Sequence, residues 1–219
     1  MTDADSSVWD ADELADPRII GTRDLVDSLG ASIADVLINA RDRALERLQT
    51  EYGDAPVAGV SNFDGIARNA ITIALTEGDV RRLAEPTIED SVRRTLTRLG
   101  SDNHFPKIQR DFGAQHGQRV RFVSRSIVLD TRAAADDMLD RMRTRTRNVA
   151  MAGGNIDDVV DNIRNDFDDG TIGNRARLIA RMNIQQAITT TKLSEYDLSP
   201  DIGGFRIINP CTQTTTRLC

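Results

Sequence analysis

Apolar residues recur at spacings of three and four over residues 22–50, a pattern that predicts one long amphipathic helix. Thr22 is its expected N-cap, because a hydroxyl there can accept a hydrogen bond from a free first-turn amide. A stretch containing glycine and proline, 52–59, is expected to end it. The stripe consists of Leu25, Leu29, Ile33, Val36, Leu37, Ala40, Ala44, Leu45 and Leu48.

The same periodicity predicts five further helices, with a less helical part in the middle of the chain. Pro86 should interrupt one helical stretch, since an interior proline removes a backbone donor; Thr87 would then cap a short helix. Gly78 and Gly153–Gly154 are expected stops, and Asn155 an expected cap. The expected ranges are 63–77, 87–99, 131–152, 156–167 and 174–196.

Two stretches favour β structure over helix. Residues 119–129 hold β-branched side chains in partial alternation, which predicts an irregular or short β segment over 104–130. Residues 203–208 are typical of a strand. We therefore expect a mainly α protein, a multi-helix body with a small β-containing C-terminal end. Its expected parts are an acidic N-terminal arm (1–21), an N-terminal helical part (22–103), the irregular segment (104–130), a helical core (131–197) and a strand with a cysteine-bearing tail (198–219).

The acidic arm carries six acidic residues and one basic residue in its first 20 positions, without a clean period. Such a segment is typical of extended or disordered chain. Trp9, the only tryptophan, is an apolar anchor that would dock on the protein's own body or on a partner.

The charged residues are unusual in type. Only two of the 28 basic residues are lysine, and only seven of the 34 acidic residues are glutamate, with a net charge of −6. Many short carboxylates and little lysine suggest a halophilic host, where an acidic surface keeps proteins dispersed. The alternative, an acidic protein from any GC-rich genome, accounts for arginine over lysine but less well for aspartate over glutamate. No window approaches the ~18 apolar residues of a membrane span, so no membrane partner is expected.

An arginine run at Arg141, Arg143, Arg145 and Arg147 is the candidate nucleic-acid-binding site, because clustered guanidinium groups attract phosphates. The alternative is ion pairing along a solvated helix, with Asp137 bound to Arg141 and Asp140 to Arg143.

Candidate metal and catalytic sites are weak. With Gly170 as the sixth position of a calcium loop, the twelfth is Ala176, which has no carboxylate. Cys211 and Cys219 supply only half of a zinc site, which the two histidines, His104 and His116, would have to complete from far upstream. A disulfide or two free thiols is the simpler interpretation. No nucleophile pattern or phosphate-binding glycine loop occurs. We expect no catalytic residues, no metal and no cofactor; a metal-dependent hydrolase using the Asp clusters ranks third among the hypotheses.

The segment from Asn148 onward resembles the phage head morphogenesis family, the Mu F-like minor head proteins. Its members show a short amphipathic helix, a turn, and a helix with the signature Arg-Ala-x-x-Ile-Ala-Arg-Thr-Glu, followed by a strand and a cysteine-bearing segment. The positions that match are Arg175, Ala176, Ile179, Ala180 and Arg181. Met182–Asn183 replace the Thr-Glu pair, and Phe205 stands where the family often has tryptophan.

The resemblance implies a minor capsid or head morphogenesis protein, present in few copies inside the virion near the portal vertex. Its partners would be the portal protein, other capsid proteins and packaged DNA, and it would pass through the host cytoplasm during assembly. The alternative hypothesis is a nucleic-acid-binding module that uses the arginine run.

Three arginines at the signature, Arg175, Arg177 and Arg181, are the candidate partner contacts. Their alternative role is ion pairing with the preceding acidic helix and turn, for example with Asp166 or Asp169. On the same helix Leu178, Ile179 and Met182 are the expected buried side.

Overall fold

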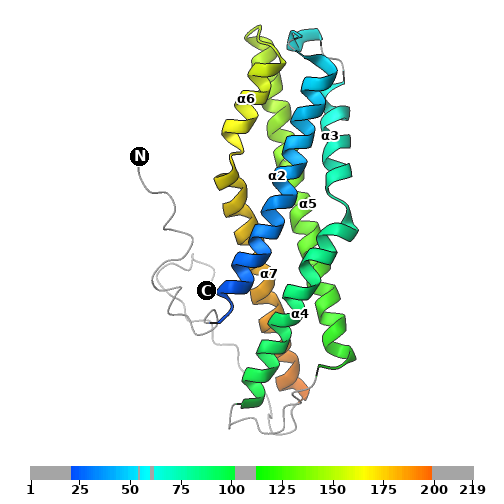
Figure 1. Cartoon of the computed structure of the whole chain (residues 1–219). Coiled ribbons are helices and arrows are strands. Elements are labelled where there is room, and N and C mark those ends of the chain that lie inside the picture. The colour runs from blue at the N-terminus through cyan, green and yellow to red at the C-terminus, as the bar shows by residue number, and fades with distance from the viewer. Residues whose placement is uncertain (1–20, 54, 60–61, 102–111, 199–219) are drawn as a thin grey trace, which may run out of the picture.

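The computed structural model describes residues 21–53, 55–59, 62–101 and 112–198, and nearly all of them are helical (Figure 1). No strand occurs within these ranges. The elements are α2 (Arg23–Tyr52), the short 3-10 helix η1 (Val57–Gly59), α3 (Phe63–Ala74), α4 (Glu77–Ser101), α5 (Ala114–Met151), α6 (Ile156–Asp166) and α7 (Asp169–Leu198).

The helices form four antiparallel columns, an up-and-down four-helix bundle. In Figure 1, α2 and α5 run in one direction, while α3 with α4 and α6 with α7 return; α2 begins above the lower ends of α4, α5 and α7. Ion pairs show the register between columns: Arg94 of α4 binds Asp24 at the start of α2 at 2.8 Å. Arg119, near the start of α5, binds Glu195 near the end of α7 at 3.3 Å.

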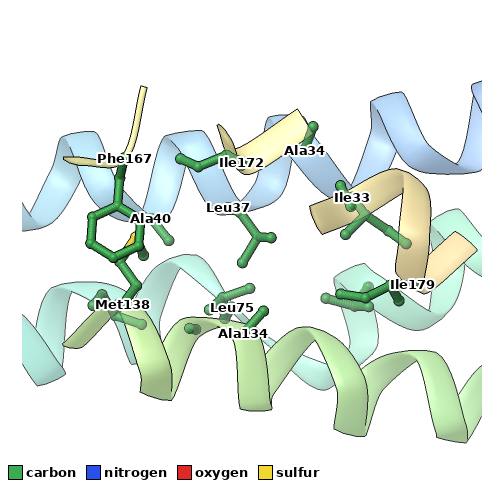
Figure 2. Close-up of a cluster of buried hydrophobic side chains, with 14 of the residues drawn as sticks. Ile33, Ala34, Leu37, Ala40, Leu75, Ala134, Met138, Phe167, Ile172 and Ile179 are labelled. Atoms are coloured by element: carbon green, nitrogen blue, oxygen red, sulfur yellow. The ribbon is translucent and has the colours of Figure 1, made fainter. Parts of the chain in front are cut away.

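The core between the columns is built of Leu, Ile, Val and Ala, as the low aromatic content requires. Figure 2 shows one layer of this core. Facing one another in it are Leu37 of α2, Leu75 after α3, two residues of α5 (Ala134 and Met138) and Phe167 after α6. Each fully buried aliphatic side chain contributes about 1.5–3 kcal/mol of hydrophobic stabilisation. The largest side chains with under 2% exposure include Leu29, Leu45, Leu48, Ile88, Leu96, Ile127, Met142, Ile156, Ile163 and Ile184.

The two returning columns are each broken once, and in the same way. Leu75 ends α3 with φ −109° and ψ 65°, and Phe167 ends α6 with φ −121° and ψ 58°. Both side chains are buried. The next residue caps the following helix: Thr76 Oγ1 accepts from the backbone N of residue 79 at 3.2 Å, and Asp168 Oδ1 accepts from that of residue 171 at 2.6 Å. The bundle thus consists of two hairpins with the same organisation. In each, one long helix (α2 or α5) is followed by a column of two helices (α3 and α4, or α6 and α7).

These junctions correct two expected boundaries. Gly78 does not stop a helix, because it lies in the first turn of α4. The last helix begins at Asp169, five residues before the expected Asn174. In both places a cap residue directly after a buried apolar residue restarts the helix, so the break needs only two residues.

The predicted break at Pro86 is also wrong, since Pro86 lies inside the continuous helix α4. Its ring is exposed, whereas Ala84, Ile88 and Val92 on the other side of the helix are fully buried. Packing of that side outweighs the lost backbone hydrogen bond, and Thr87 is an interior residue, not a cap.

Replacing Pro86 by alanine is expected to stabilise the protein by about 1–2 kcal/mol. An interior proline costs ~3 kcal/mol in a helix relative to alanine, and its stiffening of the unfolded chain returns about 1 kcal/mol. Urea unfolding followed by circular dichroism measures the change. Pro56→Ala, in the connection between α2 and α3, should give no gain, and a destabilised P86A protein would contradict the argument.

Residues 114–130, expected to be irregular or β, belong to helix α5. Val120, Val123, Ile127 and Val128 follow helical spacing and are buried at 5% exposure or less. Their β-branched side chains lower helix propensity only slightly, and packing against α4 and α7 decides the outcome. Residues 104–111 of the predicted segment, the arm at 1–20, the strand at 203–208 and both cysteines lie outside the described residues.

Several expected boundaries are confirmed. Asn155 caps α6: its side chain accepts from the backbone N of Asp158 at 2.9 Å, and the Asp158 carboxylate accepts from the backbone N of Asn155 at 2.9 Å. Gly153, with φ +75°, follows the end of α5 in a backbone conformation that favours glycine. Thr22 occupies the N-cap position of α2, although its hydroxyl makes no capping bond there.

Candidate functional site

The arginine run on α5 is engaged mainly by the protein's own carboxylates. Arg141 lies 3.5 Å from Asp137 and Arg143 lies 2.6 Å from Asp140, which confirms both predicted pairs. Arg143 also donates to Asp64 of α3 at 2.7 Å. This bond lowers the pKa of Asp64 and raises that of Arg143.

The next arginine of the run has a similar role. Arg145 donates to Asp166 at the end of α6 at 2.8 Å, and this hydrogen bond raises the pKa of Arg145. Only Arg147 of the run has no carboxylate partner among the described residues. The run therefore links α5 to α3 and α6, and most of its positive charge is offset.

The signature helix α7 buries the residues that carry the family resemblance. Ala176 and Ala180 are fully buried and Ile179 is 7% exposed, so small side chains let α7 approach α2 and α5 closely. Leu178 and Met182, expected on the buried side, are more than half exposed. They lie four residues apart on the opposite, outer side of the helix.

Arg175, the first signature arginine, binds Asp137 of α5. The expected partners Asp166 and Asp169 are occupied elsewhere, by Arg145 and Arg41 respectively. Arg175 therefore forms an ion pair, as predicted, but its partner is Asp137 and not Asp166 or Asp169. Because α7 starts at Asp169, Arg175 is on its second turn, where it faces α5 and lines the same small cavity as Phe167 of the junction.

Arg177 lies in a groove between α2 and α7. A side-chain carbon placed on Gly30 of α2 would come within 3.0 Å of Arg177 Cγ and 3.2 Å of its Cα, so the glycine permits the close approach of these helices. Arg177 is half-buried and forms no ion pair with a described residue. The groove has a volume of about 320 Å³, with Asp27, Asp35, Gly170 and Asn174 also on its walls. Arg181 is half-buried.

The junction between α6 and α7 is held by a buried arginine that the sequence reasoning missed. Arg41 of α2 donates to the carbonyl oxygen of Phe167 at 2.5 Å and to Asp169 at 2.9 Å. Burial alone would lower the pKa of Arg41, but hydrogen bonds to Asp42 and Asp169 more than offset it and raise the pKa. The signal in the sequence was an arginine inside an otherwise apolar stripe.

Asp168 of this junction should make the stability of the protein pH-dependent. The hydrogen bonds from Thr171 lower the pKa of Asp168 below its ordinary 3.8. Its stabilising contribution is therefore complete above the unfolded-state pKa and is lost as the pH falls through the lower folded-state pKa.

The matching variant is Asp168→Asn, which keeps a capping oxygen and removes the titration. Between about pH 5 and pH 3 the unfolding free energy of the wild type should fall more steeply than that of D168N. Urea unfolding at a series of pH values measures both slopes. Equal slopes would show that the Asp168 carboxylate is not preferentially stabilised in the folded state.

A buried polar cluster joins the start of α5 to the end of α7. Both helix ends lie at the bottom of the bundle in Figure 1. His116 is fully buried; its Nδ1 accepts from the backbone N of Gly113 at 2.7 Å and its Nε2 lies 3.0 Å from Glu195. Arg119 donates to the same Glu195 oxygen at 3.3 Å and to the Ser194 hydroxyl. Both ring nitrogens are occupied, so His116 has no nitrogen left for a metal.

A stack of rings and charges extends this cluster to α4. The Phe112 ring lies 5.5 Å from the His116 ring, and the Arg93 guanidinium of α4 lies 4.2 Å from the centre of Phe112. Sequence reasoning did not find the cluster, because His116 and Glu195 are 79 positions apart. No local pattern connects them.

Neither a metal-binding cluster nor a membrane span is found in the described part of the chain. Within it, no three His, Cys, Asp or Glu side chains gather in a way that would hold a metal ion. No helix in the same ranges is both long and apolar enough to cross a membrane. The acidic residues of α6 have other roles, such as the cap at Asp158 and the ion pair at Asp166.

The fold and these contacts define an all-helical bundle whose buried and interhelical charges fasten its columns together. Comparisons with known protein families, with curated proteins and with solved structures found no match.

Proposed function

We propose that this chain is a minor capsid or head morphogenesis protein of a tailed virus with a salt-loving host, associated with the portal inside the head. The signature segment carries the proposal. A short amphipathic helix, a two-residue junction and a helix with Arg175, Ala176, Ile179, Ala180 and Arg181 follow one another in the order that the resemblance requires.

The contact with the portal is assigned to the groove between α2 and α7. Arg177 supports this assignment, since it is half-buried at the groove and has no carboxylate partner in the described part of the chain. A guanidinium group held in this way binds a carboxylate of a partner with two parallel hydrogen bonds. Gly173 on the groove wall supports access for a partner side chain, because a side-chain carbon placed there would meet nothing within 4 Å.

Molar salt limits which contacts can hold this protein on the portal. Surface ion pairs are screened at molar ionic strength, where the Debye length is about 3 Å, so association must depend on short, partly desolvated contacts. Arg177 and the groove walls provide such contacts, whereas a broad field of exposed charge would not.

Purified portal mixed with the full chain in molar salt tests the proposal. Sedimentation velocity should show association at a fixed ratio, and Arg177→Glu should weaken it at least tenfold. Arg147→Glu is the matched control, because Arg147 is exposed and also lacks a carboxylate partner among the described residues; this variant should bind normally. Absence of association, or equal binding by both variants, would contradict the proposal.

The alternative, a nucleic-acid-binding module using the arginine run, is less well supported. Arg141, Arg143 and Arg145 are committed to Asp137, Asp64 and Asp166. Phosphate binding would have to break these pairs. It predicts DNA affinity in the isolated chain that falls steeply with salt, which a fluorescence anisotropy titration at two salt concentrations would reveal.

A further inference from the structure

Four large apolar side chains are exposed on the outer faces of the neighbouring helices α5 and α7. Phe122 and Leu129 of α5 are 61% and 57% exposed, and Leu178 and Met182 of α7 are 54% and 57% exposed. The members of each pair lie seven or four residues apart, a spacing that places them on one side of a helix. We name these four residues the apolar strip.

Contacts between α5 and α7 put the two halves of the strip next to each other. Asn183 donates to Asp130 at 2.8 Å, which brings their neighbours Met182 and Leu129 to the same level of the bundle. The helices are antiparallel and pack side by side, so their outward faces adjoin. The strip therefore runs along the seam between α5 and α7 and is centred on Leu129 and Met182.

Charged side chains without an ion-pair partner among the described residues lie at both ends of the strip, positive at one end and negative at the other. Arg121 and Arg125 lie on the N-terminal side of Leu129, and Asp136 lies on its C-terminal side. All three are exposed and form no ion pair with any described residue. Their neighbours Asp137 and Asp140 are instead bound by arginines of the same chain. Arg132, on the C-terminal side of Leu129, lies 3.6 Å from Glu77 of α4 and is offset by it. The charges left without an ion-pair partner among the described residues thus give the face a positive end, an apolar centre and a negative end.

We propose that a second copy of this chain covers the strip, related by a two-fold axis near Leu129 and Met182, with the two α5 helices antiparallel. Arg121 is eight residues from Leu129 and Asp136 is seven, so each lies about 10–12 Å from the axis on opposite sides. The two-fold operation brings Arg121 of each copy opposite Asp136 of the other. A face with this polarity is self-complementary, as a two-fold interface requires.

The size of the face agrees with a weak dimer. Residues 118–140 of α5 span about 33 Å, and two packed helices are about 20 Å wide. The area available is therefore on the order of 600 Å² per copy, slightly below the ~800 Å² of a standard interface. Apolar burial persists in molar salt, so it would hold the dimer together while the charges set its orientation.

The oligomeric state of the full chain tests the proposal. The protein with both cysteines replaced by serine should sediment as a dimer at about 100 µM. Met182→Glu should make it monomeric, because the new carboxylates would face each other near the axis. The control is Leu83→Glu on α4, where Leu83 is also exposed, at 44%; this variant should remain dimeric. A monomeric parent protein, or equal effects of M182E and L83E, would overturn the proposal.

Two further variants test the orientation. Arg121→Asp and Asp136→Arg should each weaken the dimer about tenfold at low salt, and the double variant should recover it because the exchanged charges again face each other. In the cysteine-free background, Leu129→Cys should form an intermolecular disulfide on mild oxidation and Leu83→Cys should not. Failure of the double variant to recover would overturn the antiparallel arrangement. This interface is independent of the virion assignment, so a monomer would leave the portal test unaffected.

Discussion

Replacing Phe167 by alanine should lower the free energy of unfolding by about 4 kcal/mol, a cost typical of removing a buried phenylalanine. The ring is 6% exposed and lies in the core layer with Leu37 and Met138 (Figure 2). Arg141 places its guanidinium group 5.5 Å from the ring centre. The substitution would remove this contact and leave a cavity at the point where α6 ends.

Urea unfolding followed by circular dichroism measures this loss, with Phe167→Leu as the control. Leucine fills much of the same volume, so F167L should cost only about 1–1.5 kcal/mol. The main-chain bond from Arg41 to the carbonyl oxygen of residue 167 does not depend on the side chain and should persist in both variants. An F167A protein within 1 kcal/mol of the wild type would show that the ring does not hold the junction.

Glu195→Ala is expected to cost about 3 kcal/mol, because it breaks a buried ion pair by removing one partner. Glu195 is 3% exposed and is shared by His116 and Arg119. Without it, the imidazole and the guanidinium group lose their common acceptor in a site closed to water. Unsatisfied buried donors of this kind are costly.

The matched variant is Glu195→Gln, which keeps one acceptor oxygen in nearly the same shape and removes the charge. Its expected loss is about 1 kcal/mol, by the same unfolding measurement. Amide hydrogen exchange adds a local measure, since E195A should accelerate exchange at the lower ends of α5 and α7. Equal losses in E195A and E195Q would contradict the account, because they would make the charge, not the acceptor, decisive.

The helical character and several helix boundaries were predictable from the sequence because they depend on local signals. The apolar stripe of α2, the Asn155 cap and the stop at Gly153 each act within a few residues. The predictions failed where packing outweighs local preference. Pro86 is tolerated because the opposite side of α4 is buried, and the β-branched residues of α5 face two neighbouring helices.

The candidate contacts also divide into those that depend on local spacing, which were predictable, and those that join distant residues, which were not. The pairs Asp137–Arg141 and Asp140–Arg143 follow from spacing along one helix and are present. The cluster at His116 and the junction held by Arg41 join residues more than 70 positions apart. An arginine inside an apolar stripe marks position 41 as unusual, but no local pattern identifies the partners of Arg41 or of His116. Exposure of Leu178 depended on where α7 begins and on which neighbours it has, and neither is a local property.

The two hairpins explain why the helix boundaries near the junctions were misjudged. Leu75-Thr-Glu-Gly-Asp79 and Phe167-Asp-Asp-Gly-Thr171 each place an apolar residue, a cap, an acid and a glycine in succession. Glycine alone suggests a stop, but a cap residue two positions earlier starts a helix. The order of these residues, not the glycine by itself, carries the information.

The most direct test of the proposed function is the protein content of purified virions. Particles purified in molar salt should contain this chain in few copies relative to the major capsid protein, and it should stay with the portal when the heads are disrupted. Quantitative mass spectrometry of whole particles and of the portal fraction gives both ratios. Absence of the chain from the particles, together with DNA binding by the isolated protein, would contradict the proposal and favour the nucleic-acid-binding alternative.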